Sequence, residues 1–268
     1  MSETTTAAPE LLKTADGGVT TLTLNRPDVL NSLTMNMMSG LSNALKDAEK
    51  DKAVRCVILT AAGRAFCAGA DLGDLKKRQS VKAFSLGDEL RDHFNPLILQ
   101  IRKMEKPVVG AVNGLAAGAG ASLILSCDVK VCSEDAKFIN AFSKVGLVPD
   151  SGMTWFLPRC MGLSLALEHA WLAKPITAQQ ALHFGWVNRL APAAQVLEKA
   201  KAMAAELAQM PPLSLALTKR ALNKALESGF EEQMEYEAQL QEILGRTKDH
   251  AEGVSAFLEK RKPVFKGE

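Results

Sequence analysis

The feature that most constrains the fold of this chain is an alternation of strand-like and helix-like segments along its first half. Residues 19–24 alternate in the manner of a strand, and residues 33–50 place apolar side chains at helical spacing. Residues 54–60 form a β-branched run typical of a buried strand. A glycine-rich loop and a helical region to about residue 104 then lead to another strand at residues 107–112. This order predicts an α/β fold.

A second glycine-rich segment continues the pattern. Residues 114–127 predict a tight turn that leads into a short apolar helix. Residues 129–132 predict a further strand, and residues 137–139 are interpreted as its partner. The first half of the chain is therefore expected to build the sheet structure.

The last third of the chain is predicted to be nearly all helical. Thr177 and Gln180 have the spacing of a capping box, and helical spacing recurs over residues 193–209, 213–226 and 231–244. No low-complexity linker separates the two halves of the sequence. We therefore expect one catalytic unit, with a core domain at residues 1–190 and a helical C-terminal region at residues 191–268.

Charge and composition favour a small-molecule partner. The 268 residues carry 32 basic and 30 acidic side chains, without the long basic run that nucleic-acid binding favours. The amino terminus lacks the basic and apolar regions of a signal peptide, and the longest weakly polar run, residues 114–127, is too short to span a bilayer. We expect a soluble, cytoplasmic protein that binds neither nucleic acid nor membranes.

Neither a disulfide framework nor a metal site is expected. The five cysteines are an odd number without CxxC spacing, and small buried side chains explain them best. The four histidines are scattered along the chain without the paired spacing of metal ligands. Catalysis, if present, is expected to depend on other groups.

Two glycine-rich turns follow predicted strands, at residues 65–72 (AFCAGADL) and 114–123 (GLAAGAGASL). Small side chains let a ligand approach the backbone, and a helix N-terminus presents unpaired N–H groups to negative charge. The two turns together favour an oxyanion hole, although glycines also serve tight turns and close packing. A dinucleotide-binding loop is a third interpretation, but the last glycine of that pattern falls on Leu123.

Asp150 is the candidate acid or base. It follows Pro149 in a turn-like segment, where an aspartate often accepts local backbone hydrogen bonds or caps a helix. The surrounding residues are largely apolar, however, among them Phe142, Val148 and Trp155. An apolar wall raises the pKa of a carboxyl group toward the range that is useful for a general base.

These motifs together resemble the crotonase family, which includes enoyl-CoA hydratases and isomerases, over nearly the whole chain. Besides residues 65–71, the resemblance is carried by residues 106–114 (KPVVGAVNG) and residues 256–261 (AFLEKR). It implies a crotonase-like spiral of ββα units with a helical C-terminal trimerisation region. It also implies assembly as homotrimers or as dimers of trimers.

The resemblance further implies roles for particular residues. The backbone amides of Ala70 and Ala119 are expected to hold the thioester oxygen of an acyl-CoA substrate. Coenzyme A is part of that substrate, so no separate cofactor is expected. The residues expected beside the acyl group or coenzyme A are Arg26, Ala68, Ala70, Asp71, Leu72, Gly118, Ser122, Phe142, Phe257 and Lys260, with Arg26, Phe257 and Lys260 near the phosphate-bearing end.

The carboxylates depart from those of the hydratases. Where hydratases of this family carry two glutamates, this chain has Ser122 and Phe142, so the pair that manages water is missing. Asp150 lies where some double-bond isomerases of the family carry an aspartate. Residues 141–152 (AFSKVGLVPDSG) look similar to the branch that isomerises a ring epoxide in phenylacetyl-CoA breakdown, although Met153 replaces a glycine expected there.

We therefore expect an acyl-CoA isomerase that either converts a 3-enoyl to a 2-enoyl thioester or rearranges a ring epoxide. Asp150 is expected to move the proton while Ala70 and Ala119 stabilise the thioester enolate. An enoyl-CoA hydratase with an atypical site and a non-catalytic acyl-CoA-binding protein are the alternatives. A dinucleotide-dependent oxidoreductase fits the glycine spacing poorly.

Overall fold

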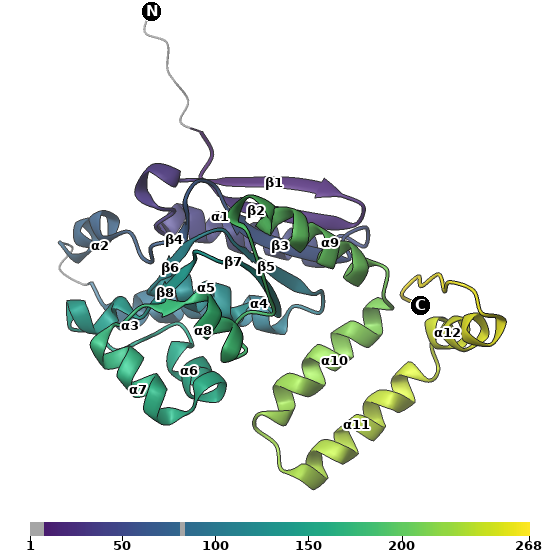
Figure 1. The fold of residues 1–268 in the computed structure, drawn as a ribbon. Helices are drawn as coiled ribbons and strands as arrows, with labels where there is room; N and C mark the ends of the chain where they lie inside the picture. Colours follow the sequence, from purple (N-terminus) through teal and green to yellow (C-terminus); the bar gives the residue numbers. More distant parts are fainter. Residues whose placement is uncertain (1–7, 81–83) are drawn as a thin grey trace, which may run out of the picture.

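The chain folds around two β-sheets (Figure 1). In the computed structural model, which describes residues 8–80 and 84–268, the larger sheet has the order β1-β2-β3-β5-β7-β10 and the smaller one β4-β6-β8-β9. The larger sheet contains β1 (Leu11–Asp16), β2 (Val19–Leu24), β3 (Cys56–Ala61), β5 (Val108–Val112), β7 (Val129–Ser133) and β10 (Arg189–Ala191). The smaller sheet contains β4 (Ala65–Cys67), β6 (Leu115–Ala117), β8 (Lys137–Ile139) and β9 (Ile176–Thr177).

Successive turns of the chain add one strand to each sheet. β3 is followed by β4, β5 by β6 and β7 by β8, and a helical segment comes after each pair. β3, β5 and β7 pair in parallel, and so do β4, β6 and β8. The carboxyl ends of β4, β6 and β8 therefore meet at one edge of the smaller sheet. The predicted α/β fold with repeated ββα units is confirmed.

Helices cover both faces of the larger sheet. Side chains alternate along β3, so Val57 and Leu59 join the core on the side of α1 (Met35–Lys50), whereas Cys56 and Ile58 face α9 (Val196–Ala208). The other α-helical and π-helical segments are α2 (Leu72–Gln79), α3 (Leu86–Glu89), a π-helical turn (Leu90–Phe94), α4 (Asn95–Lys103), α5 (Ala119–Ser126), α6 (Met153–Met161), α7 (Leu163–Leu172), α8 (Ala178–His183), α10 (Pro212–Ala225), α11 (Phe230–Leu244) and α12 (Lys248–Glu259). Short 3-10 helices lie at Pro27–Val29, Ala141–Val145 and Ala193–Gln195.

One predicted strand pairing is wrong. Residues 137–139 form a strand, β8, but it pairs with β6 and β9 instead of with β7. Both edges of β7 are already occupied, because β5 lies on one side and β10 on the other. A tight turn, in which Ala136 N–H donates to the Ser133 carbonyl at 3.0 Å, carries the chain from β7 into the smaller sheet.

The C-terminal segments lie farther from the two sheets as the chain proceeds. β10 extends the larger sheet beside β7, and α9 packs on that sheet, so the residues just after position 190 still belong to the core. Figure 1 shows α10, α11 and α12 extending away from the two sheets as an arm, which we call the C-terminal arm. Within the described residues, no helix combines the length and the apolar character that a membrane span requires.

Candidate active site

Three parallel strands bring the predicted catalytic segments together. β4, β6 and β8 lie side by side, with Cys67 opposite Ala116 and Ala116 opposite Phe138. The chain leaves β4 toward Ala70, β6 toward Ala119 and β8 toward the loop that contains Asp150. Segments that are far apart in the sequence therefore meet at one edge of the smaller sheet.

The two glycine-rich turns touch each other closely. A Cβ placed on Gly69 would lie 3.0 Å from the Ala117 carbonyl oxygen and 3.5 Å from the Ala119 nitrogen. A Cβ on Gly120 would lie 2.5 Å from the Cys67 carbonyl oxygen, closer than real Cβ atoms approach. Close packing, which the sequence left open as the reason for these glycines, is therefore part of the answer. It also brings Ala119 beside the turn that carries Ala70.

Two backbone donors remain free at this point of contact. In the described part of the chain, neither the Ala70 N–H nor the Ala119 N–H donates to a protein acceptor. Ala119 is the first residue of α5, where N–H groups lack intrahelical partners and the helix dipole is positive. Two such donors from adjacent turns have the chemistry of an oxyanion hole.

A cavity of about 340 Å³ lies in front of these donors. Seven of the residues that the sequence analysis proposed line it, namely Ala68, Ala70, Leu72, Gly118, Ala119, Phe142 and Asp150. Most of the remaining wall is apolar and comes from Leu75, Leu86, Leu90, Phe94, Ala141, Val145, Leu147 and Val148. The cavity therefore suits an apolar acyl group whose carbonyl oxygen faces the free amides.

Asp150 lines the cavity, and its side chain does not cap the helix that follows, α6. Its backbone oxygen accepts the Met153 N–H at 2.9 Å and the Ser122 hydroxyl at 3.1 Å. In the described part of the chain, its side chain accepts only the Ser151 hydroxyl, at 2.9 Å. Ser151 and Gly152 have φ values of 52° and 83°, and these left-handed conformations turn the chain sharply just after Asp150.

The environment of Asp150 has opposing effects on its charge. Burial among apolar side chains raises the pKa of the Asp150 carboxyl above its ordinary value, and the Ser151 hydrogen bond partly opposes this by favouring the ionised form. A carboxylate with a raised pKa is a stronger base than an exposed aspartate. Asp150 is thus suited to take up a proton inside the cavity.

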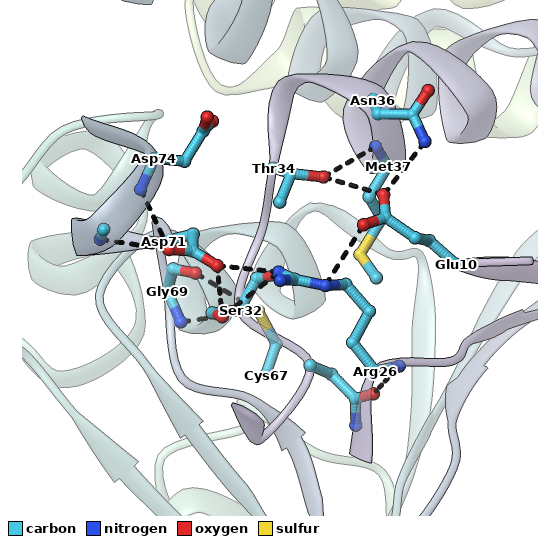
Figure 2. A network of polar contacts seen from close by, with 12 residues as sticks. Glu10, Arg26, Ser32, Thr34, Asn36, Met37, Cys67, Gly69, Asp71 and Asp74 are labelled. Atoms are coloured by element: carbon cyan, nitrogen blue, oxygen red, sulfur yellow. Dashed lines mark hydrogen bonds and ion pairs between the residues drawn. The ribbon is translucent and has the colours of Figure 1, made fainter. Parts of the chain in front are cut away.

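Three other predicted residues lie behind the cavity wall. Ser122 is fully buried, and its hydroxyl holds the Asp150 loop without lining the cavity. Asp71 caps α2 by accepting the Gly73 and Asp74 N–H groups through Oδ1. Its Oδ2 accepts from Arg26 at 2.8 Å, so the Arg26 guanidinium is engaged by the protein itself (Figure 2).

The structure places Phe257 and Lys260 in another region. Phe257 lies in the last turn of α12 and Lys260 directly follows that helix, and the helices of the C-terminal arm contribute no lining residue to the site cavity. Phe257 lines a second cavity of about 490 Å³, which is bounded by α10, α11, α12 and the residues that follow α12. The proposed contact of these two residues with coenzyme A stays a prediction.

Two charged residues of the cavity were missed by the sequence analysis. Arg78 of α2 and Glu89 of α3 form an ion pair that lines the cavity wall. The apolar residues Leu86, Leu90 and Phe94 do share one helical face, and this spacing of four is visible in the sequence. No such spacing in the sequence indicated the ion pair, because its two residues belong to two separate short helices.

The fold and the site together define an enzyme built on repeated ββα units, with two free backbone donors and the Asp150 carboxylate around a largely apolar cavity. A family model described as enoyl-CoA hydratase/isomerase matches residues 14–268. The chain therefore belongs to the enoyl-CoA hydratase/isomerase family, which is the crotonase family, as the sequence motifs predicted.

Individual relatives cover nearly the whole chain. The 1,2-epoxyphenylacetyl-CoA isomerase of Escherichia coli (strain K12) is 43% identical over 96% of this chain and 98% of its own length. The 2,3-dehydroadipyl-CoA hydratase of the same strain is 37% identical over 96% of this chain and 99% of its own length. A crystal structure of an enoyl-CoA hydratase from Polaromonas sp. JS666 superposes with a TM-score of 0.91 at 34% identity, covering 95% of this chain and 99% of that one.

Proposed function

We propose that this enzyme is an acyl-CoA isomerase in which Asp150 moves a proton within a thioester enolate. The observation that supports this most strongly is the arrangement of one raised-pKa carboxylate and two free backbone amides around a single apolar cavity. Ser122 and Phe142 occupy the positions where hydratases of the family carry glutamates, and neither provides a carboxylate. Proton transfer within the substrate needs only one such group.

The proposed reaction starts with the thioester oxygen between the Ala70 and Ala119 N–H groups. These donors stabilise the negative charge that develops on oxygen when a neighbouring C–H bond is broken. Asp150 removes that proton and returns it two carbons away, which converts a 3-enoyl thioester to the 2-enoyl isomer without a change in mass. An oxyanion donor contributes about 10²–10³-fold and general acid–base catalysis about 10²–10⁴-fold.

A ring-epoxide substrate is the more specific form of this proposal. The relative that is 43% identical is named a 1,2-epoxyphenylacetyl-CoA isomerase. The apolar wall, which includes Phe94 and Phe142, suits an acyl group derived from an aromatic ring. The same charge stabilisation at the thioester oxygen supports the rearrangement of such a ring. Phenylacetate catabolism is the corresponding metabolic context.

Hydration is the second candidate function. Glu89 lines the same cavity as Asp150, so the site does contain two carboxylates, which is the number that hydration of a double bond employs. The Glu89 carboxylate is already engaged in an ion pair with Arg78, whereas the Asp150 carboxylate accepts only one hydroxyl in the described part of the chain. We therefore rank hydration below isomerisation.

The deciding experiment is a mass-resolved product assay with a 3-enoyl-CoA, a 2-enoyl-CoA and a ring-epoxide acyl-CoA. We expect mass-neutral conversion by the wild type and a loss of at least about 100-fold in Asp150→Asn, which keeps the shape but removes the base. Asp135→Asn is the matched control, because Asp135 is an exposed carboxylate on the turn between β7 and β8.

Each outcome of this assay has a distinct meaning. Addition of water to the 2-enoyl-CoA would identify a hydratase and overturn the isomerase proposal. Tight binding of all three esters without any conversion would identify a non-catalytic acyl-CoA-binding protein. Native rates in Asp150→Asn would remove Asp150 from the mechanism, whatever the product.

We also propose that the enzyme assembles as homotrimers or as dimers of trimers. The C-terminal arm extends from the sheets and carries exposed apolar side chains, which supports burial against other copies of the chain (Figure 1). Contacts of Phe257 and Lys260 with coenzyme A, and a cytoplasmic location, belong to the same set of proposals.

A further inference from the structure

The direction of the Ala70 N–H is fixed by the residue next to it in space, Leu33. The Leu33 N–H donates to the Gly69 carbonyl at 2.8 Å, and the Leu33 carbonyl accepts the Asp71 N–H at 3.0 Å. Gly69 C=O and Ala70 N–H belong to one planar trans peptide unit, in which they point in opposite directions. Holding the Gly69 oxygen toward Leu33 therefore aims the Ala70 N–H away from Leu33.

The segment around Leu33 is itself rigidly held. Leu30 and Asn31 both adopt left-handed conformations, with φ values of 54° and 55°. The buried Asn31 amide donates to the carbonyls of Ala62 and Ala65 at 2.8 and 2.9 Å, which ties this turn to the residues around the start of β4. The segment at residues 30–33, which we call the template turn, thus forms a fixed surface along which the Ala70 loop lies.

Arg26 joins the template turn to the Ala70 loop. Its Nη1 donates to the Ser32 carbonyl at 2.7 Å and to Asp71 Oδ2 at 2.8 Å, so one nitrogen bridges the two segments (Figure 2). Glu10 holds the guanidinium from the other side, with Oε1 3.2 Å from Nε. The Ser32 hydroxyl adds a further bond to Asp71 Oδ2 at 3.2 Å.

The Arg26–Asp71 ion pair is largely buried and lies directly beside Ala70 in the chain. The Arg26 and Asp71 side chains are only 21% and 18% exposed, so water screens their attraction less than it screens a surface ion pair. Asp71 directly follows Ala70 in the chain, and its other carboxylate oxygen is fixed by the first turn of α2. Neither residue lines the cavity, so their effect on the substrate is indirect, and Ala70, which directly precedes Asp71, is the oxyanion donor nearest to the pair along the chain.

We propose that Arg26 and Asp71 are positioning residues that aim the Ala70 N–H at the substrate carbonyl oxygen. The inference rests on the proposed role of Ala70 as an oxyanion donor, but it assigns to Arg26 a task different from binding a coenzyme A phosphate. Loss of the pair lets the Ala70 peptide unit rotate about its two flanking bonds. Carbonyl polarisation then falls, although the cavity and its lining remain.

The test uses an inert probe that reports carbonyl polarisation without turnover. 4-Aminobenzoyl-CoA has no α-proton and no isolated double bond, so the enzyme has nothing to isomerise or hydrate. Its amino group is conjugated with the thioester carbonyl, and hydrogen bonds to that oxygen shift its near-ultraviolet absorption to longer wavelength. Titration of the enzyme with the probe gives the dissociation constant and, at saturation, the shift.

We expect a clear red shift in the wild type and a loss of most of it in Arg26→Met and in Asp71→Asn. The turnover number with the true substrate should fall by about 10- to 100-fold in parallel, less than the loss of a whole donor, while probe affinity changes by less than about threefold. Arg26→Lys, which keeps the charge but loses the planar fork, should recover part of the shift.

The matched control is Lys219→Met. Lys219 forms a comparably buried ion pair with Asp128, at 2.8 Å and with side chains 12% and 18% exposed, but neither partner lines the site cavity. It should lower the melting temperature without changing the red shift. If Arg26→Met and Asp71→Asn behaved like this control, the pair would be only structural and the proposal would be wrong.

Other outcomes are equally informative. A large rise in the dissociation constants of both the probe and free coenzyme A, with the full shift at saturation, would assign Arg26 to phosphate binding and overturn the inference. A wild type that shows no shift would remove Ala70 as a donor and the inference with it. A wild type that shows the shift but no isomerisation would instead count against the proposed reaction alone, because the probe does not depend on turnover.

Discussion

Replacement of Ser151 should shift the pH dependence of kcat/KM by changing the pKa of Asp150. Its hydroxyl donates to Asp150 Oδ1 at 2.9 Å and lowers the pKa of that carboxyl against the stronger effect of burial. Ser151→Ala removes the bond, so the pKa should rise further. Because Asp150 must be ionised to act as a base, the acid limb of kcat/KM should move to higher pH.

The measurement is kcat/KM from pH 4 to 9 for the wild type and Ser151→Ala. Ser255→Ala is a suitable control, since the Ser255 hydroxyl bonds to Glu259 on the exposed side of α12. A limb that stayed in place, or moved to lower pH, would contradict the role given to this hydrogen bond. Serine and alanine are strained to a similar degree in the left-handed conformation at position 151. The substitution therefore adds little backbone strain, and the pH profiles of the two proteins can be compared directly.

Asp150 should also cost the folded state some stability. Burial raises the pKa of Asp150 in the folded protein, so ionisation is less favourable there than in the unfolded chain. The resulting loss of stability is complete at pH values above the pKa of Asp150 in the folded protein. It disappears at pH values below the pKa of Asp150 in the unfolded chain. Asp150→Asn should therefore melt at a higher temperature than the wild type at pH 7, with the difference closing as the pH falls toward 4. Calorimetry over this range would refute the idea if Asp150→Asn were the less stable protein at pH 7.

For single residues, the sequence located the lining of the cavity better than the contacts that hold that lining in place. Ala70, Ala119 and Asp150 lie in short motifs that can be recognised from their own neighbours, and all three line the cavity. The partners of Arg26 could not be foreseen in this way. Asp71 is 45 positions away from Arg26, and only the fold brings the two together.

Among the structural elements, the contact between the two glycine-rich turns should tolerate little change. A Cβ on Gly120 would meet the backbone oxygen of Cys67 at 2.5 Å and its Sγ at 2.7 Å. Gly120→Ala must therefore push α5 away from β4 and separate the two oxyanion donors. We expect a loss of about 1–3 kcal/mol in the free energy of unfolding, together with a large fall in kcat.

Gly40→Ala is the control that should behave in the opposite way. Gly40 lies inside α1, where an added Cβ meets only Leu11 at 3.9 Å, so alanine should stabilise the protein by about 0.5–1 kcal/mol. Denaturant unfolding and kcat measured on both variants would separate packing from chemistry. Normal activity in Gly120→Ala would mean that the spacing of the two turns is not critical.

Long elements were predictable, whereas two of the shortest strands were not. The strand predicted at residues 19–24 is β2, and the helix predicted at residues 33–50 is α1 with Thr34 as its N-cap. β4 and β6 have three residues each, which is too short for any periodicity to emerge. The wrong partner for residues 137–139 has the same origin, because strand pairing is decided by which edges the rest of the sheet leaves open.

For the whole molecule, the C-terminal arm presents more apolar surface than a free monomer is expected to expose. Large side chains that are about half exposed or more recur on all three of its helices, at Leu222, Leu226, Phe230, Met234, Ile243, Val254, Phe257 and Leu258. Inside the chain, by contrast, α10 is anchored to the core through the Lys219–Asp128 pair. A surface of this kind is typical of an interface between subunits.

The last prediction follows from this surface. One chain has a mass of 28.8 kDa, so a homotrimer or a dimer of trimers should appear in light scattering as a threefold or sixfold multiple. Leu222→Glu combined with Phe230→Glu places two charges on the exposed faces of α10 and α11 and should lower that mass. Leu12→Glu, on the exposed side of β1, is the control that should leave the assembly intact.

A wild type that remains at the mass of one chain at micromolar concentration would contradict the assembly. If the double variant is monomeric and folded, the inert acyl-CoA probe should still shift on binding to it, because the two proposed oxyanion donors, Ala70 and Ala119, belong to the same chain.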